Sequence, residues 1–192
     1  MSAFEVGSWV GVYNSMQRGY HYEIVAERGA PTDNFYPVLT PNEMLRLGVF
    51  NGHYMTDCAQ DYPREMFAGA KFSATPDVNM NLFKAKSGDS LGAWRARGWI
   101  HEQDPRGWFE WYCRYWLGRR TQDDYRQMAR WRLFAPRHAG AVKAFGKRDV
   151  TLRRATRQAL LHWSHDPMPD IYPRTGQTIG EKVFDIMGEV SL

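Results

Sequence analysis

One segment in the second half of the chain, residues 108–116, carries six aromatic residues in nine positions. Four of them form a helical stripe with the spacing i, i+3, i+4, i+7, which is typical of a core-facing side: Trp108, Trp111, Tyr112 and Tyr115. The other two, Phe109 and Trp116, repeat at i, i+7 on the neighbouring flank. The pattern therefore predicts a helix that is buried around much of its circumference and packed on by the rest of the chain.

Helix start and stop signals recur on both sides of this segment. Thr40 can cap a helix, Pro41 suits its first position, Glu43 completes a capping box and Gly48 can end it. By the same reasoning we expect helices at 41–47, 61–67, 91–97, 105–117, 121–133, 136–146, 151–165 and 179–187, with irregular chain at 70–90.

The N-terminal part has a different character, because Tyr20, Tyr22 and Ile24 alternate as in a short strand of a hairpin. The expected fold class is thus mainly α, a single multi-helix domain over residues 1–192 with a small N-terminal β element. Residues 1–39 form the irregular or β part, 40–165 the helical core, and 166–192 a proline-rich linker with a last helix.

The cellular setting follows from what the sequence lacks. Cys58 and Cys113 have no paired spacing, and neither a signal peptide nor an apolar run of membrane-spanning length occurs, which favours a cytoplasmic protein without a membrane partner. Phosphate-loop, dinucleotide, zincin and hydrolase motifs are absent, so no cofactor is expected. His162 and His165 could form a metal pair, but no third ligand is evident and no metal is predicted.

Positive charge is concentrated in one region. Residues 101–160 carry twelve Arg and two Lys against six acidic residues, a net charge of +8, whereas the remainder sums to −4. Such a basic region, interleaved with aromatic residues, is typical of a surface that contacts nucleic acid phosphates, and we expect DNA rather than RNA. The alternative is an arginine-rich face that is merely solvated.

The basic region supplies candidate nucleic-acid contacts. Arg114, Arg119 and Arg120, at and beside a helix end, are predicted to grip phosphates. Further candidates are Arg126, Arg130 and Arg157 for phosphates, with Phe50, Trp108 and Tyr112 for stacking on a base. The alternatives are that most of these rings are packing residues and that Arg126 and Arg130 pair with nearby acids.

The loop 48–58, GVFNGHYMTDC, gathers polar groups suited to chemistry. Asn51 can read a base edge, Tyr54 can stack on an extruded base, and the Asp57 carboxylate can activate water. These are the parts of a monofunctional DNA glycosylase, with Asp57, Tyr54 and Asn51 as catalytic candidates. The alternative is that Asp57 caps a turn and His53 satisfies the backbone.

Four segments carry a resemblance over residues 40–165: GVFNGHYMTDC, RARGWI, DPRGWFEWYCRYWLGRR and RQALLHW resemble a family of small proteins from bacteria, large DNA viruses and fungi. Related sequences often have Lys where this chain has His53, so the resemblance favours Tyr54 and Asp57 as site residues. It also implies kinship with antiphage DNA glycosylases that remove modified bases, although helix-hairpin-helix signatures are absent.

The leading hypothesis is therefore a base-excision enzyme that acts on a modified base of DNA, in phage defence, with Asp57 as the hydrolytic residue. It requires the 50–58 loop and the arginines to face one cavity that is lined by Phe50, Tyr54, Trp108 or Tyr112. The alternative hypothesis is a non-catalytic nucleic-acid-binding module, and a weaker one is a basic docking face for an acidic protein.

Overall fold

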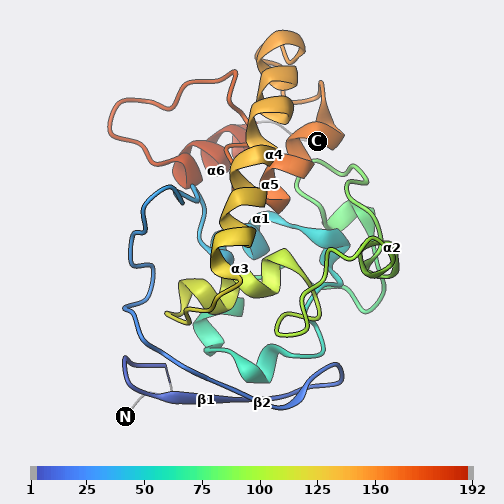
Figure 1. Ribbon diagram of the computed structural model, residues 1–192. Coiled ribbons are helices and arrows are strands. Elements are labelled where there is room, and N and C mark those ends of the chain that lie inside the picture. The colour runs from blue at the N-terminus through green and yellow to red at the C-terminus, as the bar shows by residue number, and fades with distance from the viewer. Residues whose placement is uncertain (1–3, 190–192) are drawn as a thin grey trace.

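The computed structural model describes residues 4–189 and shows a helical protein with a small N-terminal sheet (Figure 1). The strands and helices are β1 (Trp9–Tyr13), β2 (Arg18–Glu23), α1 (Pro41–Leu47), α2 (Leu91–Ala96), α3 (Trp108–Trp116), α4 (Asp124–Phe145), α5 (Arg154–His162) and α6 (Ile179–Glu189). Four short 3₁₀ turns lie at Phe50–Gly52, Ala59–Asp61, Arg64–Phe67 and Val78–Met80. The expected combination of helices with an N-terminal β element is confirmed, but long irregular connections leave less than half of the chain helical.

The predicted N-terminal hairpin is present as an antiparallel pair of strands. Val10 of β1 pairs with Tyr22 of β2, and Val12 pairs with Tyr20. Val10, Val12 and Tyr22 are buried in the core, whereas their neighbours along the strands point outward. The alternation of side chains therefore seats one face of the hairpin against the rest of the protein.

Local capping signals place two helices as expected. The Thr40 side chain accepts a hydrogen bond from the Glu43 backbone amide, and the Glu43 side chain accepts one from the Thr40 backbone amide. Helix α1 ends at Gly48, which has a φ of +108°. The Ser90 side chain likewise accepts from the Ala93 backbone at the start of α2. These contacts lie within one helical turn, which is why the sequence alone predicts them.

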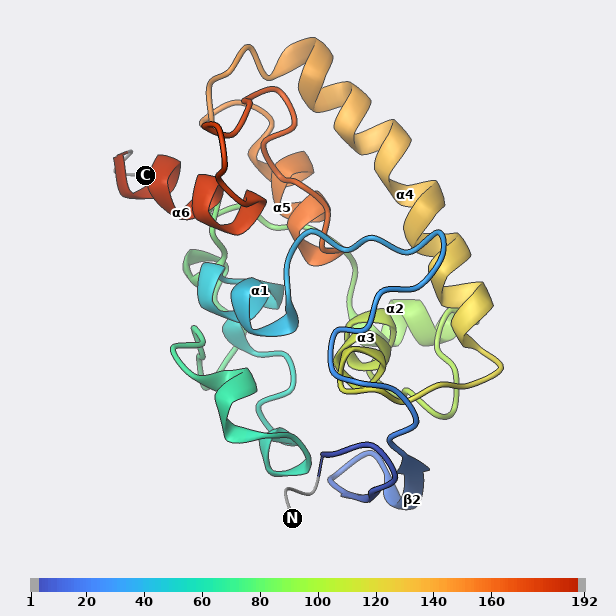
Figure 2. The same cartoon turned by 90° about the vertical axis from the view of Figure 1, so that its left-hand side faces the viewer.

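The aromatic helix α3 lies in the middle of the fold (Figures 1 and 2). Eight of its nine residues are buried, which confirms the prediction of burial around most of its circumference. The helix begins at Trp108 rather than at residue 105. The backbone of Asp104 forms an isolated β-bridge with His101, and the Asp104 carboxylate accepts hydrogen bonds from Arg114 and Arg119 instead of capping the helix.

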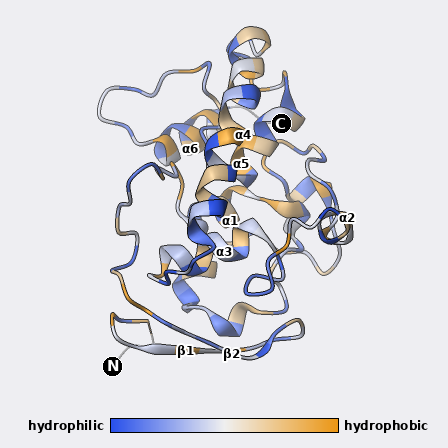
Figure 3. Cartoon of the chain, viewed as in Figure 1, coloured by the Kyte–Doolittle hydropathy of each residue, from blue (hydrophilic) through white to orange (hydrophobic). Residues whose placement is uncertain are grey.

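Helix α4 runs without interruption through Pro136, where the sequence predicted a break between two helices. A proline deprives the carbonyl four residues earlier of its partner, and here that residue, Arg132, is exposed, so water can replace the lost bond. The helix carries both hydrophilic and hydrophobic residues along its length, and it flanks the other helices (Figures 2 and 3).

Helix α5 starts at Arg154, three residues after the predicted start, and ends at His162. The predicted linker that follows it is irregular, and Arg157 of α5 holds it through two hydrogen bonds to the Asp170 carboxylate, at 2.7 and 2.8 Å. The last helix, α6, is confirmed over the predicted range. Within residues 4–189, every helix is too short or too polar to cross a membrane.

Candidate functional site

A cavity of about 740 Å³ opens between α2, α3, α4, α5 and the two loops that contain residues 50–54 and 86–89. Its volume lies within the range of about 300–1,000 Å³ that is usual for small-molecule sites. The rings among its lining residues are Phe50, Tyr54, Trp94, Trp99, Trp108, Phe109, Phe134, His138, His162 and Trp163. Such a wall offers planar faces on which a flat aromatic ligand can stack.

The rings are held in fixed orientations by contacts with one another. Phe50 stacks on His162 with ring centroids 4.3 Å apart, and Phe134 stacks on His138 at 3.9 Å and on Trp163 at 5.0 Å. Because these rings are supported by their neighbours, this part of the wall is preformed, and binding would not carry the entropic cost of ordering them.

The loop that carries Phe50 has an unusual backbone. Phe50, Asn51 and Gly52 have consecutive positive φ angles of 52°, 59° and 67°, which bulky residues rarely adopt. The Asn51 backbone amide donates to the Asn81 side chain at 2.8 Å, and the Asn81 amide donates back to the Asn51 side chain at 2.8 Å. These bonds hold a strained turn that presents Phe50 to the cavity, and strain of this kind is often found at functional sites.

Cationic side chains also line the cavity. Lys86, Arg130 and Arg137 belong to its lining, and among the described residues none of the three has a carboxylate within ion-pair distance. Burial and the charge of Arg126 lower the pKa of Arg130, so this guanidinium would gain from a bound anion. Asp89, the one lining carboxylate within residues 4–189, is already paired with Arg97.

Several sequence candidates meet at this cavity. Phe50, Tyr54, Trp108 and Arg130 all line it, although they come from a loop, α3 and α4. Tyr112 does not: it faces a separate depression of about 350 Å³, and its hydroxyl donates to the Leu39 carbonyl at 2.7 Å. The cavity thus contains three of the four aromatic residues that the sequence predicted for it.

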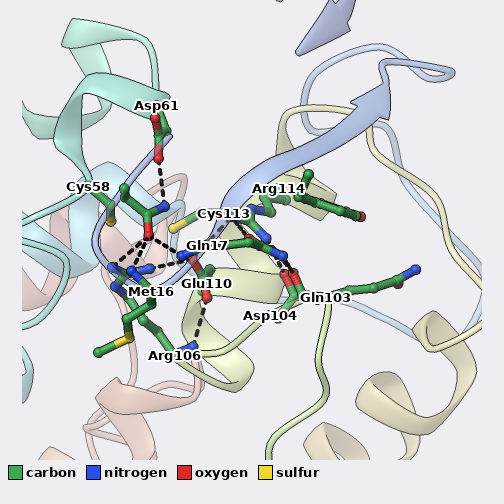
Figure 4. A network of polar contacts seen from close by, with 12 residues as sticks. Met16, Gln17, Cys58, Asp61, Gln103, Asp104, Arg106, Glu110, Cys113 and Arg114 are labelled. Atoms are coloured by element: carbon green, nitrogen blue, oxygen red, sulfur yellow. Dashed lines mark hydrogen bonds and ion pairs between the residues drawn. The ribbon is translucent and has the colours of Figure 1, made fainter. Parts of the chain in front are cut away.

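Arg114 and Arg119, which the sequence places at the surface as phosphate contacts, have side chains that are only 1% exposed. Both donate to the Asp104 carboxylate, at 3.1 and 2.6 Å. Arg114, which Figure 4 shows near Asp104 and Glu110, also bonds Glu110. Glu110 in turn accepts a bond from Arg106 at 3.0 Å. In this conformation Arg114 and Arg119 form buried ion pairs, and their guanidinium groups do not face a phosphate at the surface.

The remaining arginine candidates also have protein partners. Arg157 is fully buried and bonds the Asp170 carboxylate, so in this conformation its guanidinium does not face solvent. The Arg120 guanidinium lies 3.8 Å from the Tyr115 ring centroid and donates to backbone carbonyls. Arg126, which is partly exposed, makes two bonds to Asp123, so the acid-pairing alternative holds for it but not for Arg130.

Asp57 lies outside the aromatic cavity. Its carboxylate, 40% exposed, accepts from the Arg106 guanidinium at 2.6 Å and from the Ser15 hydroxyl. Burial alone would raise the pKa of Asp57, but the bonds from Arg106 and Ser15 outweigh it and lower the pKa. The expected meeting of Asp57 with the arginines 114, 119 and 120 around one cavity is therefore not found.

The two other catalytic candidates, Asn51 and Tyr54, make contacts that support the structure around the cavity. Asn51 directs its side chain to Asn81 and does not line the cavity. Tyr54 lines the cavity with its ring, but its hydroxyl is buried without a partner in the described chain, and burial raises the pKa of this phenol well above its usual range. Tyr54 therefore contributes its ring to the wall of the cavity, and its catalytic role stays a prediction.

Much of the cavity was missed from the sequence, because it is assembled from distant segments. One local signal was present: Arg130, Phe134 and His138 follow each other at i, i+4 along α4 and all line the cavity. Ala155 and Ala159 repeat the same spacing on α5, where their small side chains leave room for the cavity. The two alanines on one helix, together with the arginine and the two rings at matching spacing on the other, could have indicated a cavity between these helices.

Other site types find no support in the described part of the chain. Within residues 4–189, His, Cys, Asp and Glu side chains form no group of three that could hold a metal ion, and both cysteines are buried free thiols. Comparison with protein-family models, with curated proteins and with solved structures finds no match to this chain.

Proposed function

We propose that this protein binds nucleic acid by taking one unstacked base into the aromatic cavity while cations at the rim hold the adjoining phosphates. The observation that carries the proposal is the combination of a preformed wall of ring faces with three cations that lack carboxylate partners. Stacking on protein rings contributes about 1–3 kcal/mol per base, and cationic side chains supply the affinity for the backbone.

Helix α4 offers a path for the strand. Arg126, Arg130 and Arg137 are separated by four and seven residues, so they share one helical face at intervals of about 6 Å and 10 Å along the axis. Arg130 and Arg137 line the cavity, and Arg126, which is paired with Asp123, lies one turn further along the same face. A strand that follows this face would place phosphates beside the same cavity that takes its base.

The test of this proposal is the salt dependence of binding. We expect Arg130→Ala combined with Arg137→Ala to weaken binding of single-stranded DNA and to reduce the slope of log K against log salt by about 0.7 per lost phosphate contact. The measurement is a titration followed by tryptophan fluorescence, since Trp94, Trp99 and Trp163 line the cavity.

The matched control for the double variant is Arg132→Ala, which removes an exposed arginine of α4 that does not line the cavity. The control is expected to change the slope far less. If Arg132→Ala changes the slope by as much per charge removed as the double variant does, binding depends only on total charge, and the proposed placement of the phosphates is wrong.

Base excision at the same cavity is a second candidate function, and one observation favours it. Asp89 places a carboxylate in the lining, whereas Asp57 lies outside. In a glycosylase, a carboxylate activates water or stabilises positive charge that develops on the sugar once the base is extruded. A modified base remains the expected substrate, because the cost of extrusion is lowest for unusual or unpaired bases.

Release of a base leaves an abasic site that alkali cleaves, so strand breakage after incubation with modified and unmodified DNA measures this activity. We expect cleavage with the wild type, a loss of at least about 100-fold with Asp89→Asn, and a near-normal rate with Asp57→Asn. A comparable loss in Asp57→Asn alone would return the catalytic role to Asp57. No cleavage of any substrate would leave base capture without excision.

A further inference from the structure

His162, near the end of α5, combines features that the packing of the cavity does not require. The side chain is 5% exposed, lines the cavity and stacks on Phe50. Burial lowers its pKa to about 3, so the imidazole is neutral at physiological pH and carries a single ring proton. Which nitrogen holds that proton decides whether the ring presents a donor or an acceptor to a ligand.

The buried Gln158 side chain determines which ring nitrogen of His162 carries the proton. Its Oε1 accepts from the Phe83 backbone amide at 3.1 Å, and its Nε2 donates to the Gly48 carbonyl at 3.0 Å, so the amide cannot be turned around without losing both bonds. The same Nε2 lies 3.0 Å from Nε2 of His162. An amide nitrogen only donates, and therefore Nε2 of His162 accepts.

A second donor also indicates that Nε2 of His162 accepts. The backbone amide of Phe50, in the strained turn, points at Nε2 of His162 from 3.1 Å. With two N–H groups directed at Nε2, the ring proton of His162 must reside on Nδ1. The turn that presents Phe50 thus also sets the tautomer of the histidine on which Phe50 stacks.

Nδ1 of His162 forms no hydrogen bond with another described residue, and it is not one of the side-chain atoms that are buried without a partner, so it is accessible from the cavity. It lies on the side of Gly88, where an added Cβ would be 4.0 Å from it, and both Gly88 and His162 belong to the lining of the cavity. A nearly buried ring therefore offers one N–H donor, of fixed direction, to whatever occupies the cavity. A donor that is accessible from a cavity in this way can bond an acceptor on a ligand.

We propose that His162 is a specificity-determining residue of the cavity, and that its Nδ1–H donates to the N7 acceptor of a captured purine. This inference rests on the proposed base capture and names the base class. A purine has a larger face than a pyrimidine to stack against the aromatic wall, and N7 is an acceptor that adenine and guanine share. The donor would distinguish bases by the acceptor on their edge, whereas stacking alone would not.

The test is made on the ligand, so that it does not depend on a variant's folding. Short single strands that differ only at one central position carry guanine, 7-deazaguanine, thymine or an abasic site, and binding is followed by tryptophan fluorescence. We expect the wild type to bind the guanine strand about tenfold more tightly than the 7-deazaguanine strand, which keeps the ring but lacks N7. Equal binding of these two strands would overturn the role of His162.

The abasic strand separates a failure of the proposed function from a failure of the inference about His162. If the guanine and 7-deazaguanine strands bind equally, yet both bind more tightly than the abasic strand, base capture stands and the inference about His162 falls. If the abasic strand binds as tightly as the others, base capture itself fails. Preference for thymine over guanine would also overturn the assignment to purines.

Two variants test the residue directly. In His162→Phe the ring remains and the donor is lost, so guanine and 7-deazaguanine are expected to bind equally. In His162→Asn the amide nitrogen can occupy the place of Nδ1, and part of the discrimination is expected to return. Nitrogen-15 spectra of the wild type should show Nδ1 protonated, with a shift on binding guanine that 7-deazaguanine does not produce; a proton on Nε2 would contradict the inference.

Discussion

Replacement of Asp104 by alanine is expected to lower the free energy of unfolding by about 3–5 kcal/mol, because it leaves two buried guanidinium groups without their shared carboxylate. Asp104 is fully buried and accepts from Arg114 at 3.1 Å and from Arg119 at 2.6 Å. A domain of this size is typically stable by about 5–15 kcal/mol, so the loss would be a large fraction of the total. Urea denaturation of the purified variant measures it.

The matched control is Asp89→Ala, which breaks the exposed pair with Arg97 and is expected to cost no more than about 1 kcal/mol. A loss of less than about 1 kcal/mol in Asp104→Ala would contradict the structural role of Arg114 and Arg119. It would also reopen the hypothesis that these arginines are available to bind phosphates.

Filling the cavity is expected to have the largest effect on binding. Ala159 of α5 lines the cavity, and Ala159→Trp would place an indole in the space that the captured base is proposed to occupy. We expect single-stranded DNA to bind about 10- to 100-fold more weakly, which corresponds to the loss of one stacked base. Fluorescence anisotropy of a labelled strand measures the change without relying on the added tryptophan.

Two checks accompany this variant. Ala144→Trp adds the same side chain at an exposed position of α4 outside the cavity and is expected to leave affinity unchanged. Thermal unfolding of both variants shows whether the fold is retained. Undiminished binding by a folded Ala159→Trp protein would mean that nucleic acid does not enter the cavity.

The sequence predicted those elements whose signals are local. The Thr40 and Ser90 caps satisfy backbone groups within one turn, and the aromatic stripe of 108–116 has to be buried wherever it lies. Pro136 misled the prediction because the effect of a proline depends on whether the released carbonyl can reach water, and this depends on the tertiary structure.

Long-range partners explain why the site was predicted only in part. Asp104 directly precedes the predicted start of a helix at 105, but its ion-pair partners lie ten and fifteen residues further along the chain. A sum of charges over 101–160 cannot show that Arg114, Arg119 and Arg157 are neutralised inside. Phe50 and Trp108 were identified from residue type. Gly88 was not identified, and His162 was considered only as half of a metal pair, because only the folded chain places these two residues beside each other in the cavity.

The central claim, that a single base enters the aromatic cavity, is tested most directly by comparing a duplex that contains one unpaired purine with the same duplex fully paired. At equal salt, the unpaired purine is expected to raise the affinity of the wild type about tenfold or more, because extrusion from the paired duplex costs a few kcal/mol, and Ala159→Trp is expected to abolish the difference. Equal affinity of the wild type for the two duplexes, unchanged in Ala159→Trp, would contradict the account.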